Sequence, residues 1–293
     1  TRYCPGMNSR RGVARTVLSV GIAMTLVALG LMAAAAPASA APLVPPAKDP
    51  FYTTRLPLER VAPGTALKKR VVPLSYGDKR LPAVGTQILF RTTDQFGKPT
   101  AAVTTIIESP IPGPRKIISY HSPYDALGSQ CDPSYALRGG NTGRGPEFDD
   151  ITITSLLAQG YTVVVPDYEG LKMRWTMGRE SAQTALDSLR TAERHLHAPT
   201  STPIGLFGYS GGSVPTGFGA DLAPSYAPEL NIIGAAAGGV LVQPSHNLPY
   251  VNGSTQWAGV IPALMNVYND VFDLNVERYL SPKGTTVLAQ TQG

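Results

Sequence analysis

Residues 203–212 read PIGLFGYSGG, and this short segment is the strongest indication of the fold class. An apolar run ends at Tyr209, a G-x-S-x-G pattern follows around Ser210, and residues 211–222 read as a helix. This order is typical of a nucleophile elbow, in which a tight strand-to-helix turn projects a serine hydroxyl. The alternative is a simple glycine-rich turn. Pro215 adds a condition, because proline fits only the first helical turn, so the helix must begin at or just after Ser210.

The glycines around the serine suit this interpretation. Gly208 and Gly212 have no side chains, which lets the strand and the helix approach closely. The N–H group of Gly211 lies at the start of the helix, where it lacks an intrahelical partner. An unpaired N–H there is placed to meet a developing oxyanion. We therefore expect Ser210 to be a nucleophile and the amide of Gly211 to be an oxyanion donor.

On either side of this motif, apolar strand patterns alternate with helical ones. Residues 85–93 and 100–108 predict an antiparallel hairpin. Further strands are predicted at residues 116–121, 161–166, 203–209 and 231–237, and helices at residues 151–159, 178–196 and 211–222. Alternating strands and helices indicate a mostly parallel sheet covered on both faces. From about residue 244 this rhythm stops, which indicates an inserted helical segment.

The first forty residues have the layout of a secretory signal peptide. A start at Met7 is followed by Arg10, Arg11 and Arg15, an apolar run over residues 17–36, and an A-x-A site that ends at Ala40. We expect cleavage after Ala40 and a secreted protein. A retained membrane anchor is the alternative, because the apolar run is nearly long enough to span a bilayer.

The composition excludes one class of partner. Apolar residues make up 43% of the 293 residues and charged residues 15%, enough for a sizeable core. Four of the 25 basic residues, and no acidic residue, fall in residues 1–40, so the rest carries 21 basic against 20 acidic residues. The sequence therefore gives no case for a nucleic-acid partner.

Several further blocks, taken in order, resemble the secretory lipase family, α/β-hydrolases related to fungal lipase A. They are Ser119-Tyr120 with Asp125, Cys131 to Tyr135 (CDPSY), residues 163–172 (VVVPDYEGLK), Ala185-Leu186-Asp187 with Leu189-Arg190, residues 208–212 (GYSGG) and residues 225–234 (SYAPELNIIG). The resemblance covers roughly residues 80–293. It implies an α/β-hydrolase core with a helical lid, and a serine hydrolase that acts on triacylglycerols or other carboxylic esters at a lipid–water interface.

The resemblance also assigns site residues. Ser210 falls on the family nucleophile, and Asp125 falls on the residue whose backbone amide joins that of Gly211 in the oxyanion hole. The alternative role for Asp125 is a loop-capping carboxylate. No cofactor and no metal are implied, and the oligomeric state is not indicated. Residues 41–243 would be the N-terminal part of the core and residues 244–293 the start of the lid.

The chain departs from the family at the catalytic acid and base. In α/β-hydrolases the acid and then the histidine follow the serine, and the only histidine after Ser210 is His246, which does not match the family histidine. His195 and His197 end a predicted helix, and His121 ends a strand beside the oxyanion loop. We expect the missing acid and base beyond Gly293, so that the chain is an inactive fragment.

Cys131 and the acidic loop that contains Asp167 and Glu169 leave alternatives open. Cys131 is either a buried free thiol or, as the resemblance implies, half of a disulfide whose partner lies beyond Gly293. The two carboxylates follow a strand, where ligands bind in such folds, but no histidine or cysteine joins them, so a structural loop is favoured. The function has two alternatives: a non-catalytic or vestigial lipid-binding protein, and another secreted α/β-hydrolase such as a peptidase or acyltransferase.

Overall fold

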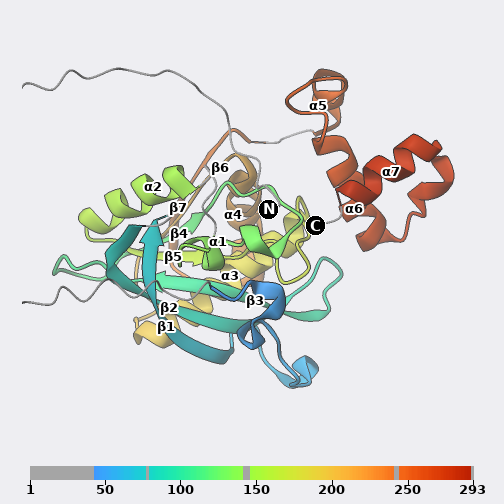
Figure 1. Ribbon diagram of the computed structural model, residues 1–293. Helices are drawn as coiled ribbons and strands as arrows, with labels where there is room; N and C mark the ends of the chain where they lie inside the picture. The colour runs from blue at the N-terminus through green and yellow to red at the C-terminus, as the bar shows by residue number, and fades with distance from the viewer. Residues whose placement is uncertain (1–42, 77–78, 141–145, 241–243, 292–293) are drawn as a thin grey trace, which may run out of the picture.

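The computed structural model describes residues 43–76, 79–140, 146–240 and 244–291, which form one mixed seven-stranded sheet with helices around it (Figure 1). The predicted signal peptide and its cleavage site lie outside these residues. The strand order is β1-β2-β3-β5-β4-β6-β7. The strands are β1 (Ala66–Tyr76), β2 (Lys79–Thr93), β3 (Pro99–Ile107), β4 (Ile117–His121), β5 (Thr162–Pro166), β6 (Ile204–Tyr209) and β7 (Ile232–Gly238).

The pairing of the strands confirms the predicted fold class. Strands β5, β4, β6 and β7 are parallel to one another, whereas β1, β2 and β3 are antiparallel and β3 joins β5 in antiparallel register. The predicted hairpin is β2–β3, with Phe90 opposite Ala102. Strand β1 was not predicted, because Pro73 and several lysine and arginine residues obscure its pattern; it lies at the sheet edge, where proline is tolerated.

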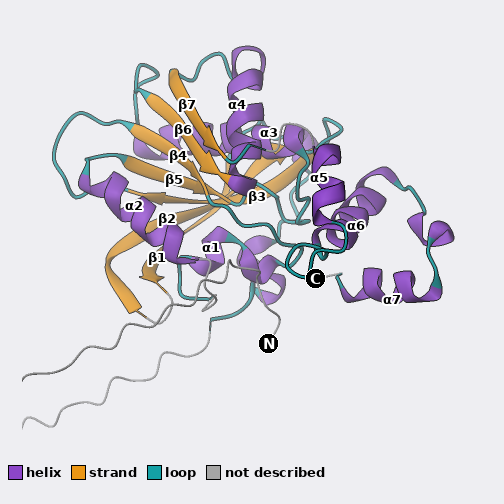
Figure 2. Cartoon of the chain, turned by 90° about the horizontal axis from the view of Figure 1, so that it is seen from above, coloured by secondary structure: helices purple, strands orange, loops and turns teal. Residues whose placement is uncertain are grey.

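Helices cover both faces of the sheet. Side chains alternate between faces along a strand, and β5 shows this directly. Val164 packs in one cluster with Leu186 and Ala223, whereas Val163 packs in another with Ile153. Helices α3 (Gly178–Leu196) and α4 (Ser213–Tyr226) therefore cover one face and α2 (Pro146–Ala158) the other, as Figure 2 also shows.

Helix α3 has the predicted bounds and provides much of the core. Ala185, Leu186 and Leu189 have no exposed surface, and full burial of each leucine is worth about 1.5–3 kcal/mol. The helix ends at Leu196, and His197 caps it in the left-handed conformation with φ 50°. Helix α4 continues beyond the predicted end and passes through Pro224.

The last described part of the chain is helical, as predicted. It contains α5 (Pro244–Val251), α6 (Val260–Phe272) and α7 (Pro282–Gln290), which lie beside the sheet rather than on its faces (Figure 1). The short helix α1 (Pro133–Ala136) and several 3₁₀ turns fill the N-terminal segment and the long loop after β4. Among the described residues, no helix is both long and apolar enough to cross a bilayer.

Candidate functional site

Ser210 lies in a sharp turn between β6 and α4. Strand β6 ends at Tyr209, Ser210 has φ 54°, and a 3₁₀ turn over Ser210–Gly212 leads into α4. A positive φ is uncommon for a residue other than glycine, and here it marks the abrupt reversal from strand to helix. Pro215 falls in the first turn of α4, so the condition set by the sequence is met.

The glycines of the turn are required by close packing. A Cβ on Gly208 would overlap the carbonyl oxygen of Gly212, and one on Gly212 would overlap the carbonyl oxygen of His121. A Cβ on Gly211 would overlap the Oδ1 atom of Asp125. The turn is therefore packed directly against the end of β4 and the loop that follows it.

The structure brings Asp125 and Gly211 together, although α2, β5 and α3 separate them in the chain. Asp125 lies in the loop after β4, with its carboxyl against the α-carbon of Gly211. Within the described residues, neither of their N–H groups donates to a turn, loop or cap acceptor. The loop after β4 and the nucleophile turn thus meet at the Asp125 carboxyl and the α-carbon of Gly211.

The carboxyl of Asp125 is buried and has one strong donor. The indole Nε1 of Trp175 donates to Asp125 Oδ1 over 2.7 Å. Burial raises the pKa of Asp125 to about 6, and the bond from Trp175 opposes part of that rise. The side chain of Asp125 therefore places a titratable group next to the turn.

Two tyrosines hold the loop that carries Asp125. The hydroxyl of Tyr168 donates to the carbonyl oxygens of Ser122 and Tyr124, over 2.8 and 3.4 Å. The hydroxyl of Tyr124 accepts from the N–H of Glu169 over 3.0 Å, and the rings of Tyr124 and Tyr168 lie 4.8 Å apart. The sequence did not single out these tyrosines, because the contacts join residues that are distant in the chain.

The acidic loop after β5 is tied into the structure. Asp167 accepts from the N–H and the hydroxyl of Ser134. Glu169 is fully buried, and within the described part of the chain its two carboxyl oxygens have no hydrogen-bond partner. Burial, with the charge of nearby Asp125, raises its pKa well above the usual value. No group of residues in the described ranges has the make-up of a metal site.

Within the described residues, none of the four histidines is hydrogen-bonded to the hydroxyl of Ser210. His121 is fully buried, with Nδ1 2.6 Å from the Thr216 hydroxyl and Nε2 3.0 Å from the Ser119 hydroxyl. Burial lowers its pKa to about 3, so it is a neutral core residue.

The other three histidines lie on helices or at a helix end. His246 is exposed on α5, and His195 and His197 lie at the C-terminal end of α3. Across the described ranges, no histidine is hydrogen-bonded to Ser210.

Cys131 packs in an apolar cluster with Tyr124 and Tyr168, and it is disulfide-bonded rather than a free thiol. The other half of this disulfide lies outside the described residues. The pairing with a cysteine beyond Gly293, which the family resemblance implies, stays a prediction.

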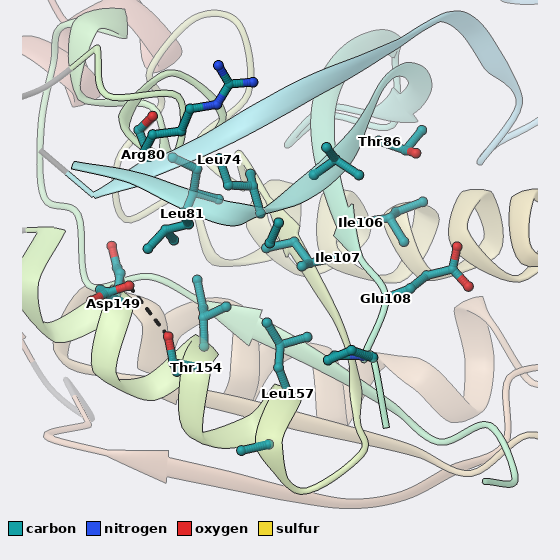
Figure 3. A pocket seen from close by; sticks show the side chains of 18 of the residues that line it. Leu74, Arg80, Leu81, Thr86, Ile106, Ile107, Glu108, Asp149, Thr154 and Leu157 are labelled. Carbon is teal, nitrogen blue, oxygen red and sulfur yellow. Dashed lines mark hydrogen bonds between the residues drawn. The ribbon is translucent and has the colours of Figure 1, made fainter. Parts of the chain in front are cut away.

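A cavity of about 810 Å³ lies elsewhere in the molecule, between α2 and strands β1 to β3 (Figure 3). Its lining is mainly aliphatic and includes Leu81, Ile107 and Leu157, with Asp149 at the first turns of α2. Asp149 accepts hydrogen bonds from Tyr120 and Ser122. The cavity borders neither Ser210 nor Asp125, so it does not contribute to the candidate site.

Comparison with protein families gives a match to secretory lipases over residues 143–291. Among curated proteins, Lipase 10 of Candida albicans is 38% identical over 234 residues, which is 76% of this chain and 50% of that protein. A protein named probable inactive lipase from Mycobacterium tuberculosis is 35% identical over 257 residues, or 84% of this chain and 57% of that protein. The chain thus spans about half the length of the curated relatives it matches.

Solved structures of similar fold include two enzymes from different organisms. Lipase A of Candida antarctica, in its closed state, superposes with a TM-score of 0.77 and 33% identity, over 86% of this chain and 60% of that one. The rice cell wall degrading esterase LipA of Xanthomonas oryzae has a TM-score of 0.58 and 20% identity, over 79% of this chain and 67% of that one. The second similarity concerns the fold alone.

Proposed function

We propose that this chain, which belongs to the secretory lipase family, carries the nucleophile and the oxyanion groups of a site that hydrolyses carboxylic esters of lipids. Ser210 is the nucleophile, and the amides of Asp125 and Gly211 are the oxyanion donors. The observation that carries the proposal is the φ of 54° at Ser210, in a turn packed against Asp125. A hydroxyl held at such a bend is accessible to a substrate carbonyl.

The chemistry follows from these positions. The Ser210 oxygen attacks the ester carbonyl after giving its proton to a base, and the carbonyl oxygen becomes an oxyanion beside the two amides. The alcohol then leaves with a proton, and water releases the acyl group from Ser210. Each oxyanion donor contributes about 3 kcal/mol to lowering the barrier.

The base is the part of this scheme that the described residues do not provide. No described histidine is bonded to Ser210, and His121 has both ring nitrogens engaged by hydroxyls. An α/β-hydrolase site of this kind needs an acid and a histidine to accept the proton of the serine. Without a bonded base, the Ser210 hydroxyl reacts slowly.

A fluorophosphonate probe tests this proposal, with imidazole added as an external base. We expect imidazole to accelerate labelling of the chain, and Ser210→Ala to abolish the accelerated reaction. Ser225→Ala, which removes an exposed hydroxyl elsewhere on α4, should label like the parent chain. Labelling that is insensitive to Ser210→Ala would contradict the assignment of the nucleophile.

A second function, lipid binding without catalysis, is favoured by the lack of a bonded base. The C-terminal helices expose large apolar side chains, such as Tyr250 on α5 and Leu274 after α6, and such surfaces are suited to a lipid interface. This alternative predicts binding to phosphatidylcholine vesicles with no labelling of Ser210 at any imidazole concentration.

The family also supports a secreted protein with a lid formed by residues 244–293. We propose removal of residues 1–40 on export, which N-terminal sequencing of the secreted protein would test. An N-terminus other than Ala41 would contradict this cleavage site.

Ester specificity is tested on nitrophenyl esters of different chain lengths, and exclusive cleavage of peptides would contradict the lipase assignment.

A further inference from the structure

We propose that Trp175 is a positioning residue that joins helix α6 to the Asp125 carboxyl, so that the docking of α6 sets the place of this carboxyl beside Gly211. The inference deepens the proposed function, on which it rests for its catalytic meaning. The structural coupling itself is testable without any catalysis.

The first step is the position of one carboxyl oxygen. Asp125 Oδ1 accepts from the indole of Trp175 over 2.7 Å, and the same oxygen lies against the α-carbon of Gly211. Trp175 is only 7% exposed, and an indole N–H is a donor only. The ring therefore fixes the orientation of the carboxyl at the point where it touches the nucleophile turn.

The second step is the contact between Trp175 and α6. Trp175 and Met177 form one buried cluster with Val267 and Val271 of α6, and Leu127 from the loop that carries Asp125 packs against it. Residues four apart lie on one face of a helix, so a single face of α6 covers the indole. Removing α6 would expose both Trp175 and Met177 to water.

Other contacts hold α6 in the same place. Asp270 Oδ2 lies 4.0 Å from Arg174 Nε, and the rings of Phe272 and Phe96 meet edge to face at 5.7 Å. Arg174 in turn contacts Glu180 over 3.2 Å. The loop that carries Trp175 is thus held between α6 on one side and the first turn of α3 on the other.

The loop that carries Trp175 has two residues with positive φ, which is consistent with a loop held in place by α6. Met173 has φ 51° and Thr176 has φ 65°, and a β-branched residue rarely adopts such a conformation. Strain of this kind persists only where the surroundings impose it. We infer that the loop relaxes when α6 leaves, and that the indole then loses its bond to Asp125.

Fluorescence measures the coupling, because the chain has two tryptophans, and Trp257→Phe leaves Trp175 as the sole indole. We expect its emission to change with pH as Asp125 is protonated, and Asp125→Asn to abolish the change. The charge of Asp125 contributes to the raised pKa of Glu169 and of Tyr168. Glu169→Gln is therefore the control for a neighbouring titration, and it should retain the change in emission. A pH-independent emission in Trp257→Phe would overturn the proposal.

The role of α6 is tested in the same background with charge-matched variants. Val267→Glu introduces a carboxylate into the packed face, whereas Tyr268→Glu introduces it on an exposed position of the same helix. We expect Val267→Glu to shift the emission to the red and to abolish its Asp125-dependent change, and Tyr268→Glu to do neither.

A second pair of variants disturbs the packing less. Val271→Ala should weaken the pH-dependent change in emission, and Val287→Ala on α7 should not. Unchanged emission in both Val267→Glu and Val271→Ala would overturn the proposal.

Labelling separates this inference from the proposed function. With imidazole present, Trp175→Phe keeps an aromatic ring but removes the donor, and we expect it to slow labelling of Ser210 about tenfold, as small misplacements near a reacting centre do. If Ser210 never reacts but the fluorescence coupling is found, the proposed function fails and the coupling stands. If Ser210 reacts equally fast in Trp175→Phe, the positioning role fails and the nucleophile stands.

Discussion

The carbonyl oxygen of His121, at the end of β4, occupies the space that a Cβ on Gly212 would need. This contact fixes how deeply the turn at Ser210 is packed into the sheet, and it ties the nucleophile turn to the strand that leads into the Asp125 loop. A side chain at position 212 would force apart the two segments that make the candidate site.

Gly212→Ala should therefore destabilise the protein. We expect a loss of about 1–3 kcal/mol in the free energy of unfolding, the usual cost of overpacking a close contact, measured by urea denaturation. Gly217→Ala is the matched control, because a Cβ at Gly217 in α4 meets nothing within 4 Å. It should stabilise the protein by about 0.5–1 kcal/mol. Equal effects of the two substitutions would contradict the packing of the turn.

The charge of Asp125 should control the reactivity of Ser210. Because the pKa of Asp125 is raised to about 6, its carboxyl is largely neutral below that pH and negative above it. A negative charge beside Gly211 opposes the developing oxyanion, so labelling of Ser210 should slow as the pH rises through 6. The rate is to be followed at a constant concentration of neutral imidazole, and Asp125→Asn should remove this pH dependence.

Stability should fall as the pH rises toward neutrality. Burial raises the pKa of Asp125 and Asp149 to about 6 and that of Asp167 to about 7, whereas these groups titrate near 3.8 when exposed. Each contribution is fully present below the unfolded pKa and is lost as the pH rises through the folded pKa. His121, whose pKa is lowered, acts in the opposite direction below pH 6.5. We expect a higher midpoint of thermal unfolding at pH 5 than at pH 8.

The contribution of one buried carboxyl to this pH dependence of stability can be tested at Glu169. Its carboxylate is buried and, within the described residues, unpaired, so Glu169→Gln should flatten the loss of stability between pH 5 and pH 8. Thermal unfolding at both values measures this. A slope that is as steep in Glu169→Gln as in the parent would show that Glu169 stays ionised, or is not buried.

Tyr168→Phe should loosen the Asp125 loop. The substitution removes the hydroxyl that donates to the carbonyls of Ser122 and Tyr124, and losing such a buried donor costs about 1–3 kcal/mol. We expect slower labelling of Ser210 as well. Tyr226→Phe also loses hydroxyl bonds, which are partly buried and reach Thr93 and Asp187. It should leave labelling unchanged, because Tyr226 is at the end of α4 opposite to the turn.

The sequence predicts the fold well where a local pattern is strong. The bounds of α3 follow from its apolar spacing, and the order of strand, Ser210 and helix follows from the motif. Strand β1 was missed because Pro73 hides its pattern, and the early start of α2 was missed because its first residues are polar. The secondary structure of these two segments is stabilised by contacts with other parts of the chain rather than by the intrinsic propensity of their residues.

The candidate site was predicted in part. The motif and the resemblance identified Ser210, Gly211 and Asp125, and the structure brings the three together. The bond from Trp175 to Asp125 was not predicted, nor were the bonds from Tyr168, because neither follows from spacing along the chain. Strand β7 was predicted as an ordinary strand, and its position at the sheet edge, with Ile233 70% exposed, was not.

The most direct test of the account is a crystal structure of the chain after fluorophosphonate labelling with imidazole. We predict phosphorus bonded to the Ser210 oxygen, with one phosphonyl oxygen about 2.7–3.1 Å from the backbone nitrogens of both Asp125 and Gly211. A phosphonyl group on another residue, or one on Ser210 whose oxygens all point away from these two amides, would contradict it.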